Sequence, residues 1–292
     1  MIMKQKTIFV AICGKPNVGK STILNKFLQE KLSIVSYKPQ TTRNSIRGVL
    51  TKGDVQVVFV DTPGILNKPK SKLQDVIVKN AWNGMSEGID LACFVIDGEN
   101  GLTHSTLELA KSVRAKIPNM ICVINKVDRI KQEEFKFKTA LKIAETGLFD
   151  EIFGMSATKQ QGIDEVLEYI MSKAKEDRWF YEEDDLTDRP NALIASDVTR
   201  ETIFNKIKDE IPYGVDVITN IFTFHEGYIE IAQDILISRK AYKPIILGSH
   251  GSMIKAIRVS TTKKLEDFYE TKVNLELFVK VKEDWLEKVK VD

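Results

Sequence analysis

The residues of this sequence best suited to chemistry form a glycine-rich loop near the N-terminus. Residues 14–21 read GKPNVGKS, which matches the phosphate-binding pattern G-x-x-x-x-G-K-[ST] at every fixed position. In such a loop, backbone N–H groups surround a phosphate, the lysine reaches the terminal phosphates and the last hydroxyl binds Mg2+. We therefore expect a nucleotide to be bound by Gly14, Asn17, Val18, Gly19, Lys20, Ser21 and Thr22.

A second motif, Asp61-Thr62-Pro63-Gly64, follows an apolar run 40 residues after Ser21. The Asp61 carboxylate can hold Mg2+ through a water, and the Gly64 N–H can meet a terminal phosphate. By itself the pattern D-x-x-G is usually only a turn. Its place directly after a predicted strand favours a role in the same phosphate site.

A third motif, Asn125-Lys126-Val127-Asp128, indicates which base is bound. A carboxylate at Asp128 can accept hydrogen bonds from the ring N–H and the exocyclic amine of guanine. Adenine lacks both donors on that edge and would leave the carboxylate unpaired, which discriminates strongly. The stem of Lys126 can lie along the base, and a backbone N–H of Ser156, Ala157 or Thr158 can meet the guanine oxygen. The sequence therefore predicts GTP and GDP as ligands.

A fourth candidate, Gly248-Ser249-His250-Gly251, lies in a basic part of the sequence. The pattern G-x-x-G alone is often a plain turn. From residue 236 to 264, however, seven Lys and Arg residues occur with no Asp or Glu. Glycines allow close approach of a nucleic-acid backbone, and neighbouring aliphatic residues can support bases. We expect RNA to be bound by Lys240, Lys243, Gly248, Ser249, His250, Gly251, Lys255 and Arg258.

The elements that must position the first three motifs alternate along the chain up to about residue 172. Alternating apolar strands and helices are typical of a parallel sheet covered on both faces, where ligands bind beyond the carboxyl ends of the strands. We expect an α/β P-loop GTPase domain with a mostly parallel sheet over residues 1–175. Its strands are expected at 8–13, 55–60, 91–96, 121–124 and 152–155, and its helices at 22–28, 72–85, 102–115, 133–146 and 163–173.

A change of pattern follows this domain. Residues 176–190, which contain the acidic run 182–185, are expected to be a solvated linker. Beyond it, residues 191–292 predict a smaller α+β domain. Its helices are expected at 192–209 and 252–268, and its strands at 215–224, 228–238 and 273–281.

Composition excludes several classes of protein. The 292 residues carry a net charge of only +2, so any basic surface has to be local. All three cysteines lie in apolar runs without metal-ligand spacing, which predicts buried thiols in a reduced compartment and argues against structural zinc. No uncharged apolar stretch approaches the ~18 residues that a membrane span needs.

The nucleotide motifs resemble those of the small GTPases of translation and ribosome biogenesis. This resemblance implies a switch loop at residues 39–43, in which Thr42, or alternatively Thr41, completes the Mg2+ shell when GTP is bound. The residues implied in catalysis are Lys20, Thr42, Asp61 and Gly64.

Two positions in these motifs bear on the rate of hydrolysis. Ile65 stands where Ras-like enzymes carry a glutamine that orients the attacking water, so we expect a slow intrinsic GTPase. Two interpretations of Asn17 remain open. It is either a ligand for K+, as in related GTPases, or a residue that only shapes the loop.

The fourth motif resembles the glycine tetrad of KH domains, although Ser249-His250 replaces the basic residue common at the inner pair. β-propensity indicates a strand for residues 245–247, whereas a KH fold requires a helix there, and both readings stand. A GTPase domain followed by a KH domain resembles the Era family of bacterial ribosome-assembly GTPases over essentially the whole chain.

The Era resemblance implies a cytoplasmic monomer that binds the 3′ region of small-subunit ribosomal RNA and the small ribosomal subunit, with GTP favouring the RNA-competent state. Peripheral contact with the inner face of the cell membrane is a further expectation. Two alternatives remain open. One is an RNA-binding assembly factor in which hydrolysis only times release, and the other is a GTPase that acts at membranes or on protein partners.

Overall fold

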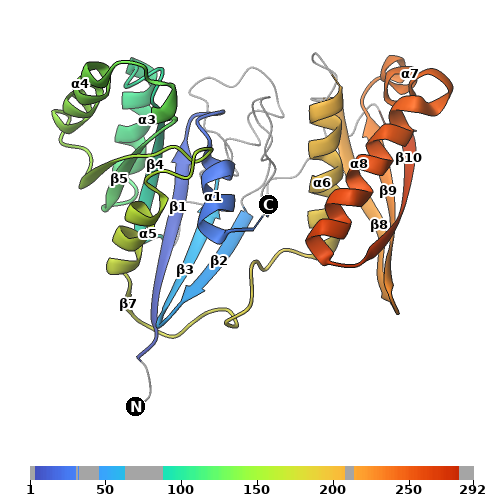
Figure 1. Ribbon diagram of the computed structural model, residues 1–292, viewed down its shortest axis with the longest axis horizontal. Coiled ribbons are helices and arrows are strands. Elements are labelled where there is room, and N and C mark those ends of the chain that lie inside the picture. Colours follow the sequence, from blue (N-terminus) through green and yellow to red (C-terminus); the bar gives the residue numbers. More distant parts are fainter. Residues whose placement is uncertain (1–3, 31, 33–45, 63–87, 208–213, 283–292) are drawn as a thin grey trace. The chain divides into compact units, whose positions relative to one another are not determined.

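The computed structural model describes residues 4–30, 32, 46–62, 88–207 and 214–282 (Figure 1). These residues form two compact units, and the chain passes from the first to the second between Asp188 and Arg189. Among them, no helix combines the length and the apolar composition needed to cross a bilayer. The expected helix at 72–85 lies outside the described residues.

The described part of the first unit contains one mostly parallel sheet with strand order β2-β3-β1-β4-β5-β6, and β7 pairs with the start of β1. β1, β3, β4, β5 and β6 run parallel, while β2 and β7 are antiparallel to their neighbours. The predicted α/β class is confirmed. The strands are β1 (Lys6–Gly14), β2 (Ile46–Lys52), β3 (Val55–Asp61), β4 (Leu91–Asp97), β5 (Met120–Asn125), β6 (Glu151–Gly154) and β7 (Lys175–Glu176).

Helices cover this sheet because most residues of its inner strands are apolar. All residues of β3 and β5 are buried, as parallel strands with two covered faces require. α3 and α4 pack through Leu109 and Ile143 on a core that includes Cys122 of β5. α1 and α5 contact each other and strands β1 and β3. The bounds are α1 (Lys20–Leu28), α3 (His104–Arg114), the short η1 (Val127–Arg129), α4 (Glu133–Ala144) and α5 (Ile163–Ser172).

The charged segment 176–188 lies against the first unit. The buried side chain of Gln56 on β3 accepts hydrogen bonds from the backbone N–H groups of Phe180 at 2.8 Å and Tyr181 at 3.1 Å. Its amide donates to the Tyr181 carbonyl at 3.0 Å, and the Val49 N–H of β2 donates to the Leu186 carbonyl at 2.9 Å. The acidic residues 182–185 themselves are exposed. The chain therefore leaves the first unit only after Asp188.

The second unit is an α+β domain with a three-stranded sheet in the order β10-β9-β8. β10 is parallel to β9, and β8 is antiparallel to it. α6 and α8 contact each other, and both contribute buried side chains to the core over this sheet. The elements are α6 (Asn191–Lys206), β8 (Val215–His225), β9 (Tyr228–Ile237), η3 (Lys240–Tyr242), α7 (Lys243–Leu247), η4 (Ser249–Gly251), α8 (Ser252–Tyr269) and β10 (Lys272–Val281).

The structure decides between the two interpretations of residues 245–247, and it contains an edge strand, β2, that was not expected. Residues 245–247 belong to helix α7, so the strand suggested by their β-propensity is wrong; Pro244 in the first turn suits a helix start, and packing of the buried Ile246 outweighs propensity. β2 was not expected, because its glycine and charged ends obscure the apolar pattern of an edge strand.

Candidate functional site

The glycine-rich loop joins the end of β1 to the start of α1, at the carboxyl edge of the sheet. Gly14 has φ +143°, and a Cβ there would lie 2.5 Å from the Val95 carbonyl oxygen of β4. Gly19 has φ +102°, and a Cβ there would collide with the side-chain amide of Asn125. Both fixed glycines of the motif are therefore required by the neighbouring strands as well as by the backbone conformation.

The Lys20 side chain is buried beneath this loop. Its ammonium donates hydrogen bonds to the Lys15 carbonyl at 2.9 Å and the Gly14 carbonyl at 3.2 Å. Burial lowers the pKa of Lys20 to about 8, and the nearby Asp61 carboxylate acts in the opposite direction. The loop thus holds a poorly hydrated cation, which an arriving phosphate would stabilise.

Ser21 and Asp61 come together from the start of α1 and the end of β3. The Ser21 hydroxyl donates to Asp61 Oδ2 at 2.9 Å. A hydroxyl and a carboxylate are oxygen donors of the kind that Mg2+ takes, so the two side chains fit the magnesium role. Thr42, Gly64 and the position that bears on water activation, Ile65, lie outside the described residues.

Asn125 connects the loop to the base-recognition motifs. Its buried amide nitrogen donates to the Val18 carbonyl at 2.8 Å, and its oxygen accepts from the Ala157 N–H at 3.2 Å. Asp128, in η1, is exposed, and its Oδ1 accepts from the Ser156 hydroxyl at 2.5 Å. Of the expected phosphate and guanine residues, the structure thus brings those that it describes to one edge of the sheet.

Asp97 belongs to this site and was missed from the sequence. Its Oδ2 accepts from Lys126 Nζ at 2.7 Å, and its side chain is only 13% exposed. Lys126 also donates to the Asn17 carbonyl at 2.8 Å, so one ammonium joins the ends of β4 and β5 to the glycine-rich loop. The signal was an aspartate directly after the apolar run of β4, at the same edge of the sheet as the three motifs.

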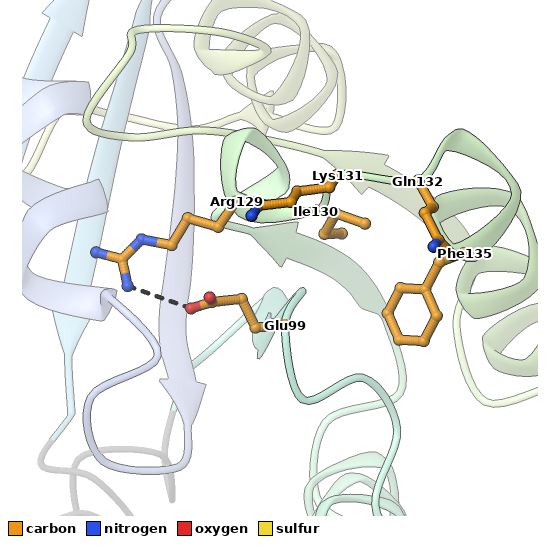
Figure 2. A pocket seen from close by; sticks show the side chains of 6 residues that line it. All are labelled: Glu99, Arg129, Ile130, Lys131, Gln132 and Phe135. Carbon is orange, nitrogen blue, oxygen red and sulfur yellow. Dashed lines mark hydrogen bonds and ion pairs between the residues drawn. The ribbon is translucent and has the colours of Figure 1, made fainter.

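A separate cavity lies beside η1. It has a volume of about 300 Å³, and Arg129 on its wall is paired with Glu99 at 3.2 Å (Figure 2). None of the expected nucleotide residues lines it, so it is distinct from the nucleotide site. The lining residues are Glu99, Arg129, Ile130, Lys131, Gln132 and Phe135.

The G-x-x-G segment forms a tight loop between α7 and α8. Gly248 has φ +74°, and a Cβ there would lie 2.6 Å from the Met253 backbone nitrogen, while Gly251 has φ +75°. His250 also has a positive φ, of 48°. None of the four expected RNA-binding cations forms an ion pair with a described residue. The expected RNA-binding residues whose side chains are exposed around the loop are Lys240, Lys243, Ser249, His250, Lys255 and Arg258.

Comparison with known proteins matches both units. Residues 9–126 match the model of the 50S ribosome-binding GTPase family, and residues 210–286 match that of the KH domain. GTPase Era of Rickettsia bellii is 39% identical over 282 residues, which cover 96% of this chain and 94% of the relative. GTPase Era of Clostridium tetani is 37% identical over 283 residues, with 96% and 95% covered.

Two solved structures agree with this result. Era of Aquifex aeolicus bound to GDP and AlF4− has a TM-score of 0.92 and 34% identity, with 97% of this chain and 96% of that chain covered. Era in complex with MgGDPNP and nucleotides 1506–1542 of 16S ribosomal RNA has a TM-score of 0.91, 33% identity and the same coverage. The chain therefore belongs to the Era family of GTPases.

Proposed function

We propose that this chain is a GTP-hydrolysing switch that binds small-subunit ribosomal RNA and assists maturation of the small ribosomal subunit. The observation that carries the proposal is the combination, in one chain, of a site with guanine-nucleotide motifs and a G-x-x-G loop surrounded by exposed cations that form no ion pair with a described residue. It is supported by the likeness to Era solved with MgGDPNP and a 16S ribosomal RNA segment.

The nucleotide site explains how hydrolysis is assisted. Backbone N–H groups of the loop and the Lys20 ammonium stabilise the charge that develops on the transferring phosphoryl group. Ser21, and Asp61 through a water, would hold Mg2+, which supplies further positive charge there when bound. Roles for Thr42 and Gly64 in catalysis, and a slow intrinsic rate because of Ile65, remain predictions.

Base recognition is assigned to Asp128. Its exposed carboxylate is oriented by the Ser156 hydroxyl and can accept two hydrogen bonds from guanine. Asn17 has φ 63°, a conformation that asparagine tolerates, which supports its loop-shaping role. A role in K+ binding is a prediction, and an unchanged turnover when Na+ replaces K+ would contradict it.

RNA binding is assigned to the loop at residues 248–251 and to the exposed Lys240, Lys243, Lys255 and Arg258. His250 stands where KH domains commonly carry a basic residue, so we expect weaker phosphate attraction there than a Lys or Arg side chain would give. We place the protein in the cytoplasm as a monomer, in line with a ribosome-assembly role, and retain peripheral membrane contact as a prediction.

The test replaces Gly248 and Gly251 together by Asp. A Cβ at Gly248 collides with the next helix, and two carboxylates repel phosphates, so affinity for the 3′ segment of 16S ribosomal RNA should fall by about tenfold or more. GDP affinity should not change. Gly53→Asp is the matched control, because Gly53 also has a positive φ but stands in open space in the first unit.

Unchanged RNA affinity in the double variant would overturn the RNA-binding assignment. Absence of RNA binding by the unmodified chain would instead favour the alternative of a GTPase that acts on protein or membrane partners.

A further inference from the structure

The β8–β9 hairpin ends in an exposed group of aromatic side chains. Phe224 is 61% exposed and Tyr228 is 40% exposed. The rings of His225 and Tyr228 stack with centroids 4.7 Å apart, and Phe224 meets the ring of Tyr269, at the end of α8, edge-on at 6.3 Å. Phe224, His225, Glu226 and Tyr228 are called the hairpin tip below.

The surroundings of the hairpin tip are acidic. Within residues 223–230 and 266–272, the charged groups are five carboxylates and one ammonium, in addition to His225. Glu230 Oε2 lies within hydrogen-bond distance of His225 Nε2, at 3.0 Å, and Glu226 is exposed in the turn. The five carboxylates are Glu226, Glu230, Glu266, Asp267 and Glu270, and the ammonium is Lys272.

The tip and the G-x-x-G loop lie at opposite ends of the second unit. The loop precedes Ser252, the first residue of α8, whereas Tyr269 is the last. An 18-residue helix is about 27 Å long, and Figure 1 shows α7 and the end of β8 at opposite ends of this unit. The two ends of this domain therefore differ in chemistry: one end carries cations, and the other carries aromatic rings among carboxylates.

We propose that the hairpin tip is a docking surface for a Lys- and Arg-rich protein segment. Exposed aromatic faces attract ammonium and guanidinium groups, and aromatic side chains are the usual anchors of interfaces. The surrounding carboxylates attract a cationic partner and repel the phosphates of RNA. The proposal rests on the proposed function, in that the G-x-x-G loop holds ribosomal RNA while the tip meets protein on the same subunit.

The test compares two targets for the full chain: naked 16S ribosomal RNA and the small ribosomal subunit with its proteins. For the double variant Phe224→Ser/Tyr228→Ser, affinity for the subunit should fall about fivefold or more, while affinity for naked RNA stays within twofold. Phe137→Ser is the matched control, because Phe137 is 66% exposed on α4, in the other unit.

A charge reversal at Glu226 gives a second test, in which affinity for the subunit should fall while affinity for naked RNA should not. Glu226→Lys adds a cation to the tip, so binding to naked RNA should stay equal or rise, whereas binding to the subunit should fall. Glu183→Lys makes the same change in the exposed acidic run and should not lower affinity for the subunit.

Phe224 also packs against Phe222, with ring centroids 5.3 Å apart, so thermal unfolding of each variant is measured as well. If the aromatic variant unfolds, Glu226→Lys decides the question. Equal losses on both targets would show an RNA contact and overturn the proposal, as would subunit binding that neither variant lowers. If the wild-type chain binds the subunit but not naked RNA, only the assignment of RNA binding is overturned. If it binds neither target, both the RNA assignment and the docking proposal are overturned.

Discussion

At the scale of single residues, the burial of Lys20 supports its proposed role in binding phosphate. Its ammonium has lost most of its water, and two backbone carbonyls hold it in place. Desolvation disfavours the charged form, which is why its pKa falls from 10.5 to about 8. A phosphate restores a strong partner for the charge, so binding of a nucleotide should raise this pKa again.

The first prediction concerns pH. Above pH 8 the free protein loses the Lys20 proton while the nucleotide complex keeps it, so the complex holds more protons and affinity falls as pH rises. We expect the Kd for GDP, measured with a chelator present, to rise up to about tenfold per pH unit above pH 8. In Lys20→Arg the side chain stays charged, so affinity for GDP should be weaker but should change less with pH. Titration of the nucleotide itself contributes to the pH profiles of both proteins. Parallel profiles for the two proteins would contradict the prediction.

The second prediction concerns Asp128. In Asp128→Asn the side chain presents an amide, which cannot accept both hydrogen bonds from guanine but can donate to the second carbonyl of xanthine. We expect affinity for GDP to fall about 100-fold or more and affinity for xanthosine diphosphate to rise, by competition binding. Asp184→Asn, in the exposed acidic run, is the control. Retention of GDP binding by Asp128→Asn would remove Asp128 from base recognition.

At the scale of elements, β3 contributes to two separate contacts. Its last residue, Asp61, accepts from Ser21 in the nucleotide site. Its buried Gln56 instead binds the backbone of residues 180–181, which fastens segment 176–188 beside the sheet. A buried glutamine in an otherwise apolar strand is thus explained by the chain segment that covers it.

The third prediction follows from that contact. Gln56→Leu removes the hydrogen bonds to Phe180 and Tyr181 and leaves backbone groups without partners, so the free energy of unfolding should fall by about 2–4 kcal/mol. Amide exchange at Phe180 and Tyr181 should become faster. Gln132→Leu, which replaces an exposed glutamine, should change neither quantity. Slow exchange at Phe180 in Gln56→Leu would show that other contacts hold the segment.

At the scale of the whole molecule, two adjacent residues are anchored to different units. Asp188 accepts from Arg47 of β2 at 3.1 Å, and Arg189 pairs with Asp197 of α6 at 2.7 Å. The side chains of Arg189 and Asp197 are nearly buried, whereas those of Arg47 and Asp188 are more exposed. We therefore propose that the functional boundary between the GTPase and KH domains lies at this peptide bond.

The fourth prediction tests that boundary with two fragments. Residues 1–188 should bind GDP within twofold of the full chain and unfold in one transition. Residues 1–175 lack the cover of Gln56 and the contact between Phe180 and Phe9, whose rings lie 5.1 Å apart, so this fragment should melt at a lower temperature. Equal melting temperatures would place the boundary nearer residue 175.

By itself, the sequence determined the family and the fold class, and it predicted that the phosphate and base motifs lie at one edge of the sheet. The reason is that a phosphate loop, D-x-x-G and N-K-x-D are each short, and each follows an apolar run. Parallel strands then bring their carboxyl ends to one edge, so order along the chain was enough to predict that Lys20, Asp61 and Asp128 share a site.

Only the tertiary structure decided the features that depend on contacts between distant residues. The pairing of Asp97 with Lys126, the cover that residues 176–188 provide for Gln56, and the aromatic end of the second unit all join positions well separated in the chain. Residues 245–247 form a helix because packing of Ile246 overrides a local preference for strand. Local pattern predicts which residues share a strand end, whereas burial and charge pairing are known only once the chain has folded.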